Sequence, residues 1–138
     1  MTNDLVSDML TRIRNASMAR HSFTRIRYSK LNIAILRVLQ NDGYIKSFEI
    51  EENTESKKAI KTFLKYKGWW IKKPFFSIIK RISKPGKRIF SGYKDFNNKI
   101  DVLKYEQGTA IISTSSGIMS HLKAIKIKKG GEILCYIG

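Results

Sequence analysis

The stretch that decides the fold is G-T-A-I-I-S-T-S-S-G, residues 108–117. Its first half predicts a buried strand, because β-branched residues dominate Thr109 to Ile112. The apolar residues that follow recur at helical spacing: Ile118, Met119, Leu122 and Ile125. This spacing predicts a strand-to-helix turn that directs N–H groups and hydroxyls toward an anion. The alternative is that Ser115 or Ser116 only caps the helix.

The residues that precede this stretch predict a compact α-β-α-β-β unit. Residues 4–17 form an amphipathic pattern that Asn3 or Asp4 can cap, and a second helix runs from the cap Ser29 to Gly43. Strands are predicted over residues 20–28, 44–51 and 60–66, with a turn at 53–54. The side chains expected to face inward from the second helix are Leu31, Ala34, Ile35, Val38 and Leu39. On the strand after it, Tyr44, Phe48 and Ile50 are expected to share one side.

A boundary is predicted within residues 67–74, where Gly68 and Pro74 flank two tryptophans, Trp69 and Trp70. The chain then divides into an N-terminal unit, 1–66, and a C-terminal unit, 67–138. In the second unit we expect a strand over 75–82, a Lys84–Lys87 turn, an extended segment 88–90, a short helix from Asp95 toward Gly108, a helix over 118–128 and a strand over 132–137. The predicted fold class is α/β (α+β), with a second unit of mixed β and two short helices.

Charge restricts the classes of partner. The 138 residues include 27 Lys and Arg against 11 Asp and Glu, a formal net charge of +16, and 42% hydrophobic residues suffice for a core. No acidic residue lies between Glu55 and Asp95. A folded surface of one sign favours a polyanion, and nucleic acid fits better than a membrane, because no apolar run reaches the length of a span. The polar, acidic N-terminus is unlike a targeting peptide, and the single Cys135 fits a reducing compartment.

No residue pattern indicates catalysis. His21 and His121 are the only histidines, and neither stands at a metal-ligand spacing from cysteine or carboxylate. The serines of the turn lack the flanking glycines of a nucleophile elbow. We therefore predict no enzyme, no cofactor and no metal. The alternative from another class is a basic RNA-processing enzyme that uses His21 or His121.

Four motifs resemble the bacterial-type ribosomal protein eight of the small subunit, nearly end to end. They are M-L-T-R-I-R-N-A at 9–16, R-I-S-K-P-G-K-R-I-F at 81–90, S-T-S-S-G-I-M at 113–119 and G-G-E-I-L-C-Y-I at 130–137. The resemblance implies a non-catalytic protein that binds the central domain of small-subunit ribosomal RNA early in assembly and supports translation. It also implies a second role, repression of translation by binding its own messenger RNA.

The resemblance carries over to particular residues. The Ser-Thr-Ser-x-Gly loop falls on Ser113, Thr114, Ser115 and Gly117, with Ser116 between them, and would contact bases and sugars. The basic turn, Lys84, Pro85, Gly86, Lys87 and Arg88, would lie beside it on the phosphates, and Phe90 at the end of that motif would stack or pack. Further backbone contacts would come from Arg12, Arg14, Asn15, Ser29 and Lys30. Such contacts suit RNA, because paired A-form bases are hard to read and recognition uses 2′-hydroxyls, phosphates and irregular sites.

Some residues depart from the family pattern. Ser116 stands where the family usually has a basic residue, and Phe90 stands where an aromatic hydroxyl is common. The expected partners are ribosomal RNA and neighbouring small-subunit proteins, without a membrane and without homo-oligomers. The richness in Ile, Lys and Asn predicts an A+T-rich coding source. The expected location is therefore an organellar ribosome, in the plastid stroma or mitochondrial matrix, with the bacterial cytoplasm as the alternative.

Overall fold

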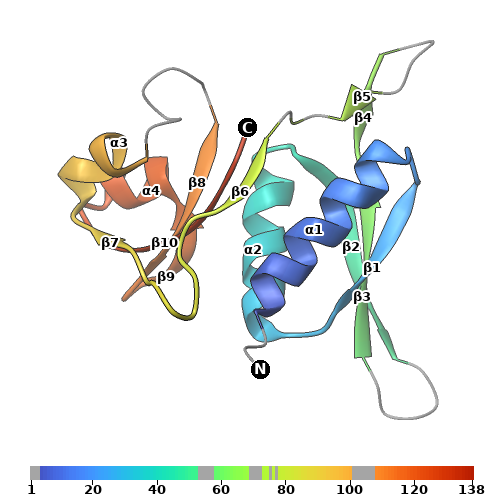
Figure 1. Ribbon diagram of the computed structural model, residues 1–138, viewed down its shortest axis with the longest axis horizontal. Helices are drawn as coiled ribbons and strands as arrows, with labels where there is room; N and C mark the ends of the chain where they lie inside the picture. The colour runs from blue at the N-terminus through green and yellow to red at the C-terminus, as the bar shows by residue number, and fades with distance from the viewer. Residues whose placement is uncertain (1–3, 53–57, 69–72, 75, 77, 101–107) are drawn as a thin grey trace. The chain divides into compact units, whose positions relative to one another are not determined.

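The computed structural model describes residues 4–52, 58–68, 73–74, 76, 78–100 and 108–138, and the chain falls into two units (Figure 1). The first unit ends at Phe76 and the second is Ser77–Gly138. The sequence predicts that the first unit ends at residue 66 and the second begins at residue 67. The difference arises because β4 (Tyr66–Lys67) pairs with β5 (Lys73–Pro74), which joins residues 73–74 to the first unit.

In the first unit, α1 and α2 lie against one face of an antiparallel sheet with the strand order β1-β3-β2 (Figure 1). The element bounds are α1 Leu5–Met18, β1 Phe23–Arg27, α2 Lys30–Asn41, β2 Ile45–Glu52 and β3 Lys58–Leu64. Asp4 caps α1 by accepting a hydrogen bond from Ser7 N at 3.2 Å, as predicted. The α-β-α-β-β order of this unit is therefore confirmed within the described residues.

One inward-facing prediction in this unit is wrong, and the first long strand differs in detail from the predicted one. Leu31 is 37% exposed. The buried residues of α2 are Asn32, Ile33, Ile35, Leu36, Val38 and Leu39. The strand expected over 44–51 is β2, whose register shifts between Ile45 and Ser47, and Ile45 at its start is buried in the core. Ile50 is 49% exposed at the end of the strand, near the Lys58–Glu52 ion pair.

The second unit is built on a sheet with the order β6-β10-β8-β9, and β7 also pairs with β10. Its elements are β6 Ile79–Arg81, β7 Phe90–Ser91, the 3-10 helix η1 Tyr93–Asp95, α3 Phe96–Lys99, β8 Thr109–Thr114, β9 Gly117–Ser120, α4 His121–Lys126 and β10 Gly131–Ile137. Its buried core comprises Phe96, Ile100, Ala110, Ile112, Met119, Ala124, Ile133 and Tyr136. The mixed α+β class with two short helices in this unit is confirmed.

The predicted strand-to-helix turn after residue 112 is wrong. Strand β8 continues to Thr114, turns through Ser115 and Ser116, and returns as β9, so that Thr114 pairs with Gly117. Gly117 has φ +113°, a conformation that favours glycine and lets the chain reverse. The helix begins only at His121, and its cap is Ser120, whose Oγ accepts a hydrogen bond from Lys123 N. Neither Ser115 nor Ser116 is a helix cap.

Other predictions are met only in part or lie outside the described residues. The strand expected over 75–82 is β6 alone among the described residues, and the helix that starts at residue 96 ends at Lys99 in the described part. Asp95 stands at the cap position of α3 without accepting a capping hydrogen bond. The turn at 53–54, Trp69, Trp70 and residues 101–107 of the expected short helix lie outside the described residues. None of the described helices combines the length and apolar character needed to cross a membrane.

Candidate nucleic-acid interface

Strand β10 brings two of the predicted binding turns to the same end of one sheet. Glu132 at the start of β10 is the cross-strand partner of Ser113 in β8 and of Phe90 in β7. Ser113 begins the hydroxyl turn, residues 113–117, and Phe90 follows the basic turn, residues 84–88. Two motifs that are distant in sequence therefore flank a single residue of β10.

The entry to β10 depends on two glycines. A Cβ atom on Gly130 would lie 2.4 Å from the Ser91 carbonyl oxygen, and one on Gly131 would lie 2.1 Å from the Ser113 carbonyl oxygen. Both distances are shorter than any van der Waals contact. Residues 130 and 131 can therefore pass between β7 and β8 only as glycines. Their small size sets how closely the hydroxyl turn and the basic turn approach β10.

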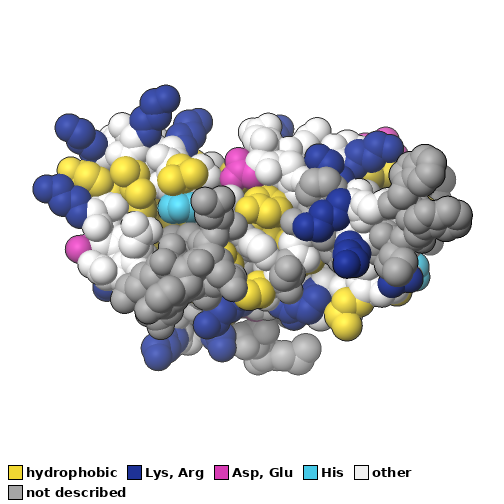
Figure 2. Space-filling model, turned by 90° about the horizontal axis from the view of Figure 1, so that it is seen from above, with side chains coloured by type: hydrophobic (Ala, Val, Ile, Leu, Met, Phe, Trp, Pro, Cys, Tyr) yellow, Lys and Arg dark blue, Asp and Glu magenta, His cyan; other side chains and the backbone are white. Residues whose placement is uncertain are grey.

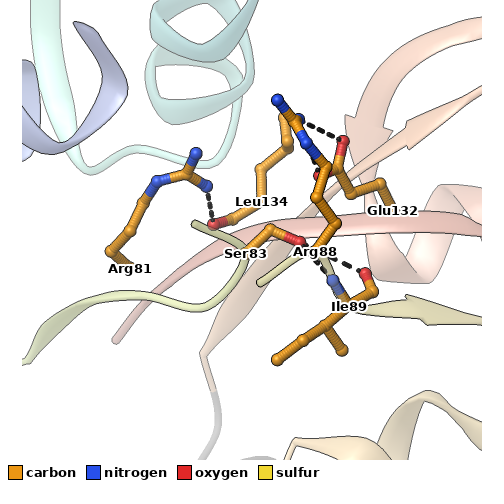
Figure 3. Close-up of polar contacts among 6 residues, drawn as sticks. All are labelled: Arg81, Ser83, Arg88, Ile89, Glu132 and Leu134. Atoms are coloured by element: carbon orange, nitrogen blue, oxygen red, sulfur yellow. Dashed lines mark hydrogen bonds and ion pairs between the residues drawn. The ribbon is translucent and has the colours of Figure 1, made fainter. Parts of the chain in front are cut away.

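The basic turn is closed by two backbone hydrogen bonds and anchored by a buried serine. Lys84 N donates to the Lys87 carbonyl at 3.0 Å, and Lys87 N donates to the Lys84 carbonyl at 2.9 Å. Ser83 is fully buried, and its Oγ accepts a hydrogen bond from Ile89 N at 2.8 Å (Figure 3). Ser83 N in turn donates to the Ile133 carbonyl in β10. The anchor leaves the turn itself, residues 84–88, exposed to solvent.

Arg88 is paired with the carboxylate at the start of β10. Its Nη1 lies 3.1 Å from Glu132 Oε2, with the Arg88 side chain 54% exposed and that of Glu132 13% exposed (Figure 3). Sequence reasoning predicted Arg88 but missed Glu132, although a single acid in a basic C-terminal segment was a signal for it. The pair positions the guanidinium beside β10 and lowers the local positive charge, and an exposed pair of this kind adds at most about 1 kcal/mol.

The hydroxyl turn divides its side chains between internal bonds and the surface. Thr114 Oγ1 accepts a hydrogen bond from Ser116 N at 3.1 Å and donates to the Gly117 carbonyl at 2.9 Å. Thr114 therefore stabilises the turn, while Ser115, Ser116 and Gly117 are exposed. Lys129, which the sequence did not single out, donates from Nζ to Ser115 Oγ at 3.3 Å and to Ser116 Oγ at 2.5 Å.

The residues predicted in the first unit have local partners of their own. Arg12 Nε lies 3.1 Å from Asp8 Oδ2, one helical turn earlier, and Asn15 is exposed on the same helix. Ser29 Oγ accepts a hydrogen bond from Asn32 N at 2.9 Å, so it caps α2 as predicted, and Lys30 beside it is exposed. Arg14 is half-buried. Their contacts with RNA stay predictions.

Of the two histidines considered for catalysis, His21 is exposed and His121 has a structural role. His121 is buried, and its Nδ1 accepts a hydrogen bond from Ala110 N at 3.1 Å, which ties α4 to β8. Cys135 is buried in β10, and burial raises the pKa of its thiol to about 12, against a smaller opposing effect from Arg81. Arg81, at the end of β6, donates from Nη1 to the Leu134 carbonyl of the neighbouring strand β10 (Figure 3). Within the described residues, no group of three or more His, Cys, Asp and Glu could hold a metal ion.

Positive charge strongly outweighs negative charge on the surface. The face in Figure 2 carries many Lys and Arg side chains and few Asp and Glu, with hydrophobic side chains between them. In the described part of the second unit, the carboxylates are Asp95 and Glu132, and Glu132 is paired. Exposed hydroxyl, ammonium and guanidinium groups on such a basic surface are typical of nucleic-acid-binding proteins. The fold and the surface place this α+β protein in that class.

The comparison with known proteins gives the family. The model of the ribosomal protein S8 family matches residues 4–137, and this chain belongs to that family. Small ribosomal subunit protein uS8c of Phaeodactylum tricornutum is 47% identical over 137 residues, and uS8c of Gracilaria tenuistipitata var. liui is 45% identical over 137 residues, with 99% of each chain covered in both cases. Protein uS8 of Trichodesmium erythraeum is 44% identical over 135 residues, 98% of this chain and 97% of the relative.

Family membership decides between the two classes left open by the sequence. The relatives are structural proteins of the small ribosomal subunit, and the chain is a ribosomal structural protein and not an enzyme. The predicted resemblance is therefore confirmed over nearly the whole chain. The relatives include both uS8c and bacterial uS8 proteins, which fits an organellar or bacterial origin.

Proposed function

We propose that this chain binds the central domain of small-subunit ribosomal RNA early in assembly of the subunit. The hydroxyl turn, residues 113–117, and the basic turn, residues 84–88, form the principal contact surface. The observation that carries the proposal is the pairing of Glu132 with both Ser113 and Phe90, which sets the two exposed turns on either side of β10.

The chemistry of the two turns suits different parts of an RNA. Short hydroxyl side chains such as Ser115 permit close approach to 2′-hydroxyls and to bases exposed at an irregular stem. Lys84, Lys87 and Arg88 are exposed cations that fit phosphates, which position the protein without reading sequence. In this proposal, the hydroxyl turn contacts bases and sugars, while the cations of the basic turn beside it bind phosphates.

The rest of the proposal concerns partners and place of action. Arg12, Arg14, Asn15, Ser29 and Lys30 would add contacts to the RNA backbone from the first unit, and neighbouring small-subunit proteins would pack against the chain, which acts as a single copy. A messenger that presents the same irregular stem would bind the same turns and so be repressed. The similarity to uS8c proteins and the Lys- and Ile-rich composition support an organellar ribosome, with a plastid favoured.

The test compares a central-domain RNA fragment with a random RNA of equal length. Ser115→Ala and Gly117→Val should weaken binding to the central-domain fragment selectively. Lys84→Ala should weaken binding to both RNAs and reduce the salt slope by roughly 0.7 to 0.9, the value of one phosphate contact. Because Gly117 has φ +113°, the folded state of Gly117→Val is checked by thermal unfolding first.

The result that would refute the assignment of specificity is an equal effect of the turn substitutions on the two RNAs. Ser115→Ala serves as the main variant here, since Ser115 is exposed and its backbone φ lies outside the left-handed region. Gly92→Ala is the control outside both turns, because a Cβ at Gly92 meets nothing within 4 Å, and it should leave binding to both RNAs unchanged.

A further inference from the structure

The ammonium of Lys129 lies on the hydroxyl turn, although Lys129 follows α4 in sequence. Its Nζ donates hydrogen bonds to Ser115 Oγ at 3.3 Å and to Ser116 Oγ at 2.5 Å. Glu132, three residues further on, is paired with Arg88, and within the described residues no carboxylate pairs with Lys129. The turn therefore holds a cation whose positive charge is not neutralised by a described acid.

The fold determines the position of Lys129 from both sides. At the end of α4, Lys128 N donates to the Ile125 carbonyl and Lys129 N donates to the Ala124 carbonyl, the bond pattern of a Schellman cap. Lys128 takes the left-handed position with φ +58°, where glycine is usual. On the other side, Gly130 and Gly131 confine the chain between β7 and β8. The backbone at Lys129 is thus fixed beside the turn.

The hydrogen bonds of Lys129 also set the polarity of the turn. An ammonium group only donates, so Ser115 Oγ and Ser116 Oγ must act as acceptors toward it. Each hydroxyl then keeps its hydrogen for an incoming acceptor, and the ammonium keeps a third N–H. A group of donors around a positive charge suits a phosphate oxygen, and charge-assisted bonds of this type are stronger than neutral ones.

We propose that Lys129, with the hydroxyls of Ser115 and Ser116, forms a subsite for a phosphate oxygen of the RNA backbone. The inference rests on the proposed RNA-binding function and adds a residue and a ligand group to it. Lys129 acts as the cation of a turn whose own residues, 113–117, are uncharged.

The experiment measures binding of the full chain to a central-domain RNA fragment as salt is varied. Lys129→Ala should reduce affinity about tenfold at low salt, as expected for one charge-assisted contact, and should lower the salt slope by roughly 0.7 to 0.9. Lys126→Ala is the matched control: it removes the same charge from an exposed lysine of α4, whereas the hydrogen bonds to Ser115 and Ser116 come from Lys129. A smaller loss is expected for it.

A rescue variant separates the role in binding from a role in folding. Because Ser116 Oγ lies 2.5 Å from the Lys129 ammonium, Ser116→Lys combined with Lys129→Ala returns a cation to the turn and should restore most of the affinity and the slope. Equal losses for Lys129→Ala and Lys126→Ala, with wild-type binding intact, would overturn the inference. If wild type does not prefer the central-domain fragment over random RNA, the proposed function itself fails, and that result is distinct.

Discussion

Replacing Gly131 by alanine tests whether the close approach of β8 and β10 is required. The new Cβ would lie 2.1 Å from the Ser113 carbonyl oxygen and 2.9 Å from the Ser113 carbonyl carbon. Reaching a tolerable contact requires a shift of about 1 Å. The obstructing atoms belong to backbone in a strand ladder, where Ser113 pairs with Glu132, so no flexible side chain can move aside.

Forced overpacking of this kind typically costs 1 to 3 kcal/mol, and a backbone obstacle places Gly131→Ala at about 2 to 3 kcal/mol. For a unit of this size, that loss lowers the melting temperature by roughly 10 °C or more. The assay is thermal and urea unfolding of the full chain, followed by circular dichroism. Displacement of β8 also moves the hydroxyl turn, so RNA affinity measured where the variant is still folded should fall as well.

Gly86→Ala is the control for this experiment. A Cβ there meets nothing within 4 Å, and Gly86 does not have a positive φ. Its stability should stay within about 0.5 kcal/mol of wild type or rise slightly through loss of unfolded-state entropy. The reasoning is refuted if Gly131→Ala unfolds together with Gly86→Ala and wild type.

Two further outcomes follow from the strand β10. Glu132→Gln should tighten RNA binding severalfold at low salt and steepen the salt slope, because Arg88 then loses its carboxylate partner and is available to a phosphate; weaker binding in a fluorescence anisotropy titration would contradict this. Burial raises the pKa of Cys135 from 9.0 to about 12, so its contribution to stability is complete below pH 9 and is lost as the pH rises toward 12. The difference in unfolding free energy between wild type and Cys135→Ala should therefore shrink over that range, and a constant difference would count against it.

The elements that the sequence predicted well are those with local signals. Helix α1 combines an apolar stripe with the cap Asp4, and helix α2 combines the cap Ser29 with Gly43, whose φ is +83°. The tight turn at Lys84–Lys87 likewise follows from a Pro-Gly pair. In each case the residues that specify the element lie within a few positions of it.

The hydroxyl turn was mispredicted because its apolar pattern fits two structures. Ile118, Met119, Leu122 and Ile125 have helical spacing, but the first two belong to strand β9 and only the others to helix α4. Two local signals favoured the hairpin, the Ser-Gly pair at 116–117 and Ser120 as a cap three residues before Lys123. Met119 is buried in either case, so hydrophobicity could not distinguish them.

Local sequence patterns cannot predict side-chain contacts between residues that are distant in sequence. Arg88 and Glu132 are 44 residues apart, and Lys129 and Ser115 are 14 apart. Both contacts depend on the order of strands around β10, which the sequence does not state. The composition predicted that cations gather on the surface, whereas the pairing of strands determines which of them stand at the turn.

The hairpin changes the physical basis of anion binding at the turn. A helix N-terminus would attract a phosphate through unsatisfied N–H groups and the helix dipole, without help from a side-chain charge. In the hairpin, Ser116 N is already used by Thr114 Oγ1, and α4 begins beyond β9. Attraction for an anion must then come from side chains, and Lys129 is the cation bonded to the turn. The greater sensitivity of binding to Lys129 than to Lys126 thus follows from the correction of the fold.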